Sequence, residues 1–323
     1  MVALLILGLA CASTPPRPPR EPFDAQGHRG ARGLLPENTL PAFRKALELG
    51  VSTLELDTGV TADGVIVVSH NRRLSAEICL GPDGERLPEE GGPLLRELTL
   101  AQVRRYDCGS LNPSRRRFPE PPRRNLSGTP VPTLAEVFDL ANELDPAVRF
   151  NIEMKVDPTV DETVPLEEFV ARLLDLVGER GLEARVIVQC FDWRGLELVK
   201  AGRPELTTAA LLSPETLDGG GRSPWLNGLS LDDAGGTALG LLAGARAYVD
   251  VFSPYWRQIT PGAWGYLDST VEEIQAAGFP VIPWTVNSSR RIEETLDLGV
   301  DGLISDYPDR LLEILSRRGV EIL

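Results

Sequence analysis

The chain lacks an excess of positive charge. Its 323 residues include 33 Lys and Arg against 47 Asp and Glu, which gives a formal net charge of −14. A field of this sign repels polyanions, so it argues against a nucleic-acid-binding protein and against adsorption to anionic lipid headgroups. A small anionic substrate remains compatible, because a cation and nearby basic groups can reverse the field inside one pocket.

The start of the chain also lacks an apolar stretch long enough to cross a membrane. Met1–Ala10 is apolar without a break, but a membrane-spanning helix needs about 20 residues. The run fits the apolar part of an export signal, and Cys11 after Ala10 resembles the lipidated cysteine of a bacterial lipoprotein. Ser13–Pro22 is rich in proline and predicts an extended spacer. We therefore expect residues 1–24 to be a leader and spacer of an exported protein, periplasmic or membrane-anchored through Cys11, with a cytoplasmic protein as the alternative.

Cysteine is scarce, with four in the chain. Cys190 lies in an apolar β-like run and is expected to be buried. Cys79 and Cys108 share one long loop region, where an exported protein could bridge them. Two small unpaired residues are an equally good interpretation, because a sequence fixes no distance between them.

The bulk composition is that of an ordinary globular protein with a sizeable core, since 42% of residues are apolar and 25% are charged. From residue 25 onward, short β-like runs alternate with helix-like segments, a pattern typical of a parallel sheet with crossover helices. Eight such runs predict an α/β protein with a (β/α)₈ TIM barrel, and residues 25–323 form one catalytic domain in this interpretation. The predicted strands are Ala25–His28, Thr53–Asp57, Arg149–Lys155, Arg185–Cys190, Thr207–Leu212, Val249–Ser253, Pro280–Val286 and Gly302–Ser305.

Helix boundaries are marked by their usual residues. Asn38 and Thr39 before Pro41 predict the start of a helix that ends at Gly50. Residues 306–308, Asp-Tyr-Pro, repeat the same pattern before the last helix. The barrel pattern is interrupted at about residues 71–132, a stretch rich in Gly, Pro and Arg with one short predicted helix at Leu100–Tyr106. A loop of this length predicts a functional insertion over the mouth of the barrel, after the second strand region.

Histidine is the scarcest chemically useful residue, and both copies end β-like runs. His28 and His70 are followed at once by turn or loop residues. The carboxyl ends of barrel strands form the functional face, so we expect the two imidazoles to converge there as catalytic groups. A single histidine at a strand end is more often structural.

Acidic residues alternate along two of the predicted strands. Glu55 and Asp57 share one face of a strand, and in a barrel that face is the interior. Such a pair repels and is costly to bury unless a cation or a proton lies between its members. Glu153 completes a three-carboxylate site, and oxygen ligands favour Mg²⁺ or Ca²⁺. The alternative is a structural ion pair between Glu153 and Lys155.

Together these residues form a predicted phosphoryl-transfer site. A divalent cation neutralises phosphate oxygens, Arg29 clamps the phosphate, Lys155 adds a second positive charge, and the two histidines move protons. Gln189, Trp284 and Asn287 lie at later strand ends and could line the pocket, and Gln189 and Trp284 are candidate substrate-binding residues. Trp284 either stacks on the substrate or packs in the core.

Several motifs in this order resemble the glycerophosphodiester phosphodiesterase family, and the similarity extends from Gln26 to about Leu312. The motifs are His28-Arg29-Gly30, Pro36-Glu37-Asn38-Thr39, Glu55-Leu56-Asp57, Thr61 to His70, Ile152-Glu153-Met154-Lys155, Gln189-Cys190-Phe191-Asp192, Trp284-Thr285-Val286-Asn287, Gly299-Val300-Asp301-Gly302 and Asp306-Tyr307-Pro308.

This resemblance implies a (β/α)₈ barrel that hydrolyses small-molecule glycerophosphodiesters to sn-glycerol 3-phosphate and an alcohol. It implies that Glu55, Asp57 and Glu153 are metal ligands, that Arg29 and Lys155 contact phosphate, and that a glycerol hydroxyl attacks phosphorus to give a cyclic phosphate. In that reaction His28 is the base and His70 the acid.

The chain departs from the family pattern at Asn71, where most relatives have aspartate. An uncharged amide gives weaker electrostatic support to His70, although no proton carrier or proposed ligand is lost. Two other functions remain open at this point. They are a barrel phospholipase of the D type, which acts on intact lipid, and a non-catalytic barrel that binds a phosphorylated ligand. Oligomeric state is not predicted.

Overall fold

The computed structural model describes residue 20 and residues 22–112, 123–217 and 222–323. The predicted export signal, Cys11 and nearly all of the predicted spacer lie outside these residues. In the part of the chain that is described, no helix has both the length and the apolar character needed to span a membrane.

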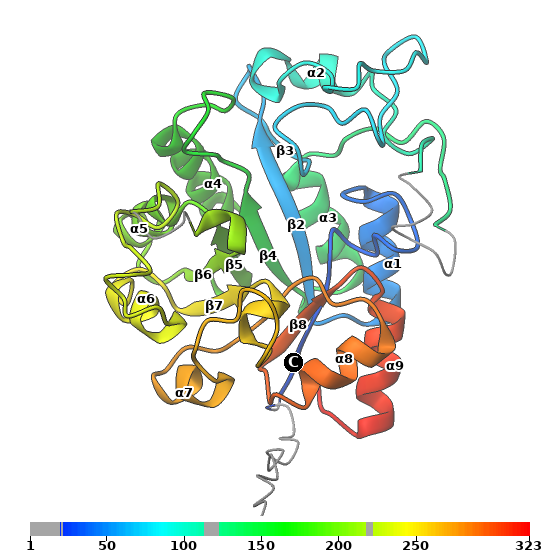
Figure 1. Cartoon of the computed structure of the whole chain (residues 1–323). Coiled ribbons are helices and arrows are strands. Elements are labelled where there is room, and N and C mark those ends of the chain that lie inside the picture. Colours follow the sequence, from blue (N-terminus) through cyan, green and yellow to red (C-terminus); the bar gives the residue numbers. More distant parts are fainter. Residues whose placement is uncertain (1–19, 21, 113–122, 218–221) are drawn as a thin grey trace, which may run out of the picture.

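A curled parallel sheet organises the fold (Figure 1). Its seven parallel strands follow the order β7-β6-β5-β4-β2-β1-β8, and the short strand β3 pairs antiparallel with β2. The strands are β1 (Asp24–Gly27), β2 (Thr53–Val60), β3 (Ile66–Val68), β4 (Arg149–Met154), β5 (Val186–Cys190), β6 (Thr207–Leu212), β7 (Val251–Pro254) and β8 (Gly302–Ser305). Seven of the eight predicted strands are therefore present.

The predicted strand Pro280–Val286 is instead an irregular extended segment between the two edges of the sheet. On one side, the amide of Ile282 donates to Phe252 O of β7 at 2.9 Å. On the other, the amide of Val286 donates to Ile304 O of β8 at 3.1 Å. Pro280 and Pro283 provide no amide hydrogen, so a regular ladder cannot form here.

Helices surround the sheet (Figure 1). They are α1 (Leu40–Leu49), α3 (Leu134–Leu144), α4 (Leu166–Arg180), α5 (Trp193–Gly202), α6 (Ala238–Gly244), α7 (Val271–Ala276), α8 (Ser289–Leu296) and α9 (Pro308–Arg318), with single 3₁₀ turns η2 (Glu183–Arg185), η3 (Pro214–Thr216) and η4 (Trp256–Ile259). Their apolar faces and the outer face of the sheet form the main core. A smaller layer inside the curl contains Ile187, Ala209, Val251, Ile282 and Ile304.

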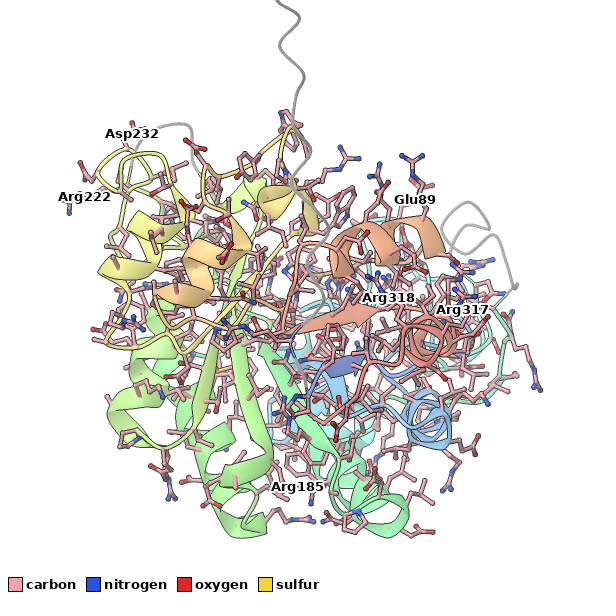
Figure 2. The ribbon with its side chains drawn as sticks, turned by 90° about the horizontal axis from the view of Figure 1, so that it is seen from below. Glu89, Arg185, Arg222, Asp232, Arg317 and Arg318 are labelled. Atoms are coloured by element: carbon pink, nitrogen blue, oxygen red, sulfur yellow. A yellow bond between two sulfur atoms is a disulfide. The ribbon has the colours of Figure 1, made fainter. Side chains whose placement is uncertain are left out.

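Charged side chains cover the outer surface of the helices. Figure 2 shows Arg317 and Arg318 on α9, and Arg318 bonds Glu293 of α8 at 2.9 Å and Asp297, the residue after α8, at 2.6 Å. These contacts fasten the last two helices to each other. Partly exposed ion pairs of this kind contribute roughly 0–1 kcal/mol each, so the burial of apolar side chains stabilises the helix packing more than they do.

The predicted start and end of α1 are confirmed. Thr39 caps the helix by accepting a hydrogen bond from the amide of Ala42, and Gly50 ends it in the left-handed conformation at φ 88°. The start of α9 is different. Pro308 occupies its first turn as predicted, but the residue at the cap position, Tyr307, makes no capping hydrogen bond through its side chain.

Residues 71–112 and 123–132 lie beyond the carboxyl end of β2, at the top of Figure 1. They contain η1 (Leu95–Glu97) and α2 (Leu100–Val103), which is shorter than the predicted helix at Leu100–Tyr106. A disulfide joins Cys79 and Cys108, and Cys190 is a buried free cysteine. The disulfide belongs to a small separate core with Val67, Leu74, Leu95, Val103 and Val131. The segment is thus packed around its own apolar centre rather than structureless.

Candidate active site

Three buried carboxylates meet at the end of two neighbouring strands. Asp57 of β2 lies directly opposite Glu153 of β4 in the parallel register, and Glu55 shares the face of Asp57. One oxygen from each of the three lies within 4.8 Å of the others. Asp57 Oδ1 is buried and makes no hydrogen bond to any residue that the structure describes. This all-oxygen set fits a hard divalent cation such as Mg²⁺ or Ca²⁺.

The three carboxylates have opposite pKa shifts because their surroundings differ. Burial, followed by the negative charge of Asp57, raises the pKa of Glu55 well above its usual range. Burial also raises the pKa of Glu153, to about 7. For Asp57 burial is the largest single influence and raises the pKa, but the charges of Arg29, His70, Lys155 and His28 together outweigh it and hold the pKa well below its usual range. Such a divided set is the expected signature of negative charges crowded at a functional site.

His28 follows β1 and is fixed by Asp306, which follows β8. His28 Nδ1 lies 2.5 Å from Asp306 Oδ1, and His28 Nε2 lies 3.8 Å from Glu55 Oε2. Asn287 donates to Asp306 Oδ2 at 2.7 Å and fixes the carboxylate in turn. A proton on Nδ1 therefore leaves Nε2 as a lone pair facing the carboxylates. Burial lowers the pKa of His28, although Asp306 opposes this shift, so the neutral form is favoured near neutral pH.

His70 lines the same cavity as His28, but it does not follow a barrel strand as predicted. The β-like run that it ends is β3, a hairpin partner of β2 rather than a barrel strand. The hairpin turns the chain back toward the site, and the amide of Ser69 donates to Asp57 O at 2.9 Å. His70 Nδ1 lies 2.6 Å from Asn71 Oδ1. Burial and the charges of Arg29 and Lys155 lower the pKa of His70 well below its usual range.

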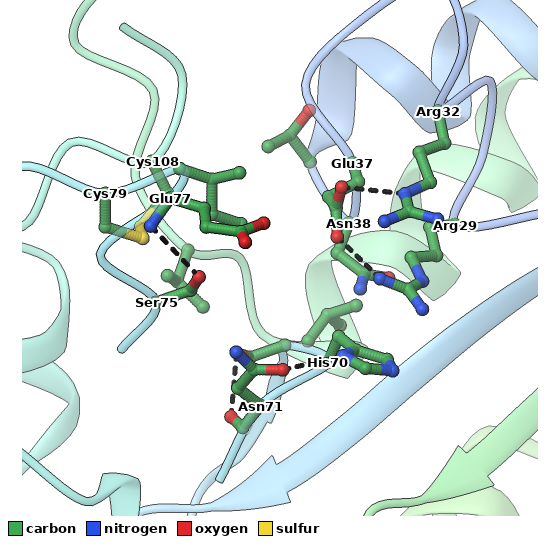
Figure 3. Close-up of a pocket in the computed structure, with 15 residues that line it drawn as sticks. Arg29, Arg32, Glu37, Asn38, His70, Asn71, Ser75, Glu77, Cys79 and Cys108 are labelled. Carbon is green, nitrogen blue, oxygen red and sulfur yellow. Dashed lines mark hydrogen bonds and ion pairs between the residues drawn. A yellow bond between two sulfur atoms is a disulfide. The ribbon is translucent and has the colours of Figure 1, made fainter. Parts of the chain in front are cut away.

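Arg29 joins the three carboxylates to a second ionic cluster, formed by Glu37, Arg32 and Arg123. Figure 3 shows Arg29 and Arg32 beside Glu37. Its Nη1 is 2.6 Å from Glu37 Oε1, its Nε is 3.1 Å from Asp57 Oδ2, and its backbone amide donates to Glu55 Oε2 at 2.8 Å. The backbone of Arg29 is left-handed, at φ 50°, an unusual conformation for a residue with a side chain. These bonds hold the residue in that conformation and hold its guanidinium at the site.

Lys155 lies beside the same carboxylates. It forms the ion pair with Glu153 that the sequence offers as an alternative to a metal site. Its Nζ is 2.7 Å from Glu153 Oε1 and 3.9 Å from Asp57 Oδ1.

Gln189 is almost fully buried and donates to Glu55 Oε1 at 2.7 Å. This bond favours a role in orienting Glu55 over direct contact with a substrate.

Trp284 is partly exposed. It packs against Phe191 and also lines the active-site cavity. Its Nε1 donates to Ser253 O at 2.9 Å, and its ring meets the ring of Phe191 edge to face, with centroids 5.5 Å apart. A cavity of about 250 Å³ lies in front of it. The cavity is lined by both charged and apolar side chains. Its lining includes His28, Arg29, Glu55, His70, Glu153, Lys155, Gln189, Phe191, Leu211, Trp284 and Ile304.

Comparison with known proteins agrees with this geometry. Residues 28–310 match the model of the glycerophosphoryl diester phosphodiesterase family. The chain belongs to this family. It is therefore an enzyme of the phosphodiester hydrolase class.

Relatives of the family match nearly the whole chain. A glycerophosphodiester phosphodiesterase from Caldanaerobacter subterraneus is 28% identical over 90% of this chain and 97% of its own length. A solved structure from Silicibacter pomeroyi, assigned to the same enzyme class, is 33% identical with a TM-score of 0.79 and covers 95% of this chain and 97% of that one. A phosphodiesterase from Oleispira antarctica shares the fold, with a TM-score of 0.64 at 19% identity, and covers 90% of this chain and 96% of that chain.

Sequence reasoning does not assign a functional role to several residues of this site. Asp306 precedes a proline by two residues, a pattern that indicates a helix start. Asn38 has the position of a helix cap, but its Nδ2 donates to Asp57 Oδ2 at 2.8 Å. Glu37 lies inside a family-like motif without a predicted role. Asn287 is predicted to line the pocket, and in the structure it holds Asp306. The signal that could have found them is that they are polar and lie close to strand ends. In sequence, a residue that caps a helix there cannot be told from one that belongs to the active site.

Proposed function

We propose that this chain hydrolyses glycerophosphodiesters to sn-glycerol 3-phosphate and an alcohol, with proton transfer by His28 and His70. The observation that carries the proposal is the convergence of two imidazoles, two cations and the carboxylates of Glu55 and Glu153 on one cavity, with Asp57 close to both glutamates. The relative from Oleispira antarctica was solved with sn-glycerol 3-phosphate as its product, which supports this product for the family fold.

In the proposed first half-reaction, His28 acts as the base. With its Nδ1 proton held by Asp306, Nε2 is free to take the proton of the glycerol hydroxyl next to the phosphate ester. The hydroxyl oxygen bonds to phosphorus, and the bond from phosphorus to the alcohol oxygen breaks. His70 gives a proton to that departing oxygen, and the product is a cyclic phosphate.

In the second half-reaction the two histidines exchange roles. His70 takes a proton from water, whose oxygen bonds to phosphorus, and His28 returns its proton to the ring oxygen as the cyclic ester opens. Arg29 and Lys155 bind the phosphate oxygens throughout. Charge-assisted bonds of this kind orient the ester and offset the negative charge that builds up on it.

A divalent cation on Glu55, Asp57 and Glu153 would supply Lewis-acid stabilisation of the phosphate oxygens when bound. Carboxylate oxygens suit both Mg²⁺ and Ca²⁺. We also propose that the protein is exported, and the Cys79–Cys108 disulfide supports this, since such bonds persist in oxidising compartments.

The test is release of sn-glycerol 3-phosphate from glycerophosphocholine, with and without EDTA. We expect release that stops in EDTA and returns on adding Mg²⁺ or Ca²⁺. His28→Ala should abolish release while the melting temperature changes little. No release from glycerophosphodiesters, with turnover of intact lipid, would favour the phospholipase D-like alternative. Phosphate binding without any turnover would favour a non-catalytic barrel.

A further inference from the structure

A buried arginine from the loop segment reaches the second ionic cluster behind Arg29. Arg123 lies far along the chain from Glu37, yet its Nη1 is 3.3 Å from Glu37 Oε2. Its side chain is 1% exposed. Burying a guanidinium costs several kcal/mol unless an anion compensates it, and the carboxylate of Glu37 is in contact with this one.

Glu37 divides its two oxygens between different partners. Oε1 binds Nη1 of Arg29 at 2.6 Å, whereas Oε2 binds Nε of Arg32 at 2.8 Å and Arg123. Although burial favours protonation, the three guanidinium groups hold the pKa of Glu37 well below its usual range. The ion pairs on Oε2 fix the rotation of the carboxylate, and therefore they fix where Oε1 holds Arg29.

The main chain around Arg123 is docked on the loop that carries these residues. The amide of Arg124 donates to Leu34 O at 2.9 Å, and Asn112 Nδ2 donates to Arg123 O at 3.1 Å. The arginine is thus held in place by its backbone and can transmit that position to Glu37. The neighbouring side chain of Arg124 is exposed.

We propose that Arg123 is a positioning residue for the phosphate clamp: through Glu37 it holds the Arg29 guanidinium in the orientation that binds phosphate. This inference rests on the proposed function, in which Arg29 contacts the phosphate. It makes the segment around the Cys79–Cys108 disulfide a part of the catalytic apparatus rather than a cover alone.

The test compares Arg123→Met with the matched control Arg124→Met, which removes the same charge from the exposed neighbour. The readouts are kcat/KM for glycerol 3-phosphate release and the affinity of the Mg²⁺-loaded protein for inorganic phosphate, measured by calorimetry. We expect both to fall about tenfold in Arg123→Met and to stay unchanged in Arg124→Met. Arg123→Lys keeps the positive charge but not the planar set of N–H donors, so its loss should be smaller than that of Arg123→Met.

The decisive comparison repeats Arg123→Met in an Arg29→Met background. If Arg123 acts through Arg29, the second substitution lowers phosphate affinity less than twofold there, because the coupled pair is not additive. An equal tenfold loss in both backgrounds, or unchanged phosphate affinity in Arg123→Met, overturns the proposal. Should Arg123→Met fail to fold, Arg123→Lys decides by the same rule, with an expected loss of about threefold that disappears in the Arg29→Met background.

The two readouts also separate this inference from the proposed function. A wild-type protein that binds phosphate but releases no glycerol 3-phosphate refutes the proposed function. In that case the role of Arg123 is still decided by the phosphate affinities of the wild type, Arg123→Met, Arg29→Met and the variant that combines the two substitutions.

Discussion

Replacing Asp306 with asparagine should reverse the proton arrangement of His28 without disturbing its position. Asn287 Nδ2 donates to Asp306 Oδ2 at 2.7 Å, so the oxygen of the new amide is drawn to that side. The amide nitrogen then faces His28 Nδ1, at the 2.5 Å contact, and must donate to it. His28 consequently carries its proton on Nε2, where the proposed base needs a lone pair.

The size of this effect follows from the value of a general base. Positioned proton transfer contributes about 10²–10⁴ in rate, so kcat for Asp306→Asn should fall by that factor, about 3–5 kcal/mol. The melting temperature should fall by no more than about 5 °C, because the side chain keeps its shape and its bond to Asn287. Steady-state release of glycerol 3-phosphate and thermal unfolding measure the two quantities.

A matched double variant separates the proton arrangement from the loss of charge. Asn287→Asp combined with Asp306→Asn exchanges the two groups, so the amide can donate to the new carboxylate and offer its oxygen to His28 Nδ1. We expect this pair to recover at least tenfold of the lost rate. A single variant with near-normal kcat, or a double variant no better than the single one, would refute the base role of His28.

Three further outcomes are expected. Asn71→Asp places a negative charge beside His70, whose pKa is lowered, so the alkaline limb of the pH profile of kcat should move up by about one pH unit; a limb that stays in place contradicts the acid role. Asp107 accepts hydrogen bonds that outweigh its burial and lower its pKa to about 2, so its contribution to stability is fully present above about pH 4 and lost as the pH falls to about 2. The difference in melting temperature between the wild type and Asp107→Asn should therefore shrink over that range, and a difference that is undiminished at pH 2 argues against this contribution. Removing the disulfide in a Cys79→Ser/Cys108→Ser protein should cost about 3.6 kcal/mol in denaturant unfolding, since the crosslink closes a loop with a sequence separation of 29. An unchanged midpoint would rule out that contribution.

The sheet and the acidic part of the site could be predicted because strand alternation is a local property. The spacing of Glu55 and Asp57 on a strand is enough to put both on one face, and the observed register sets Asp57 opposite Glu153. The segment at residues 280–286 could not be predicted in detail, because its prolines remove ladder hydrogen bonds while its other amides still bond β7 and β8.

The parts that could not be predicted depend on contacts between distant residues. Asp306 sits where a helix cap is expected, and only the return of β8 beside β1 shows that it binds His28 instead. Arg123 comes from a stretch rich in arginine and proline, which gives no sign that one guanidinium is buried against Glu37. The sequence leaves a disulfide and two free thiols as equal alternatives, and only the positions of Cys79 and Cys108 decide between them.

Titration of Mg²⁺ or Ca²⁺ into chelator-treated protein, followed by calorimetry, tests whether the three carboxylates share one ion. We predict one cation per chain in the wild type, together with at least a hundredfold weaker binding in Asp57→Asn and in Glu153→Gln. Equal cation affinity in both variants, or full turnover by the metal-free wild type, would contradict a shared metal site.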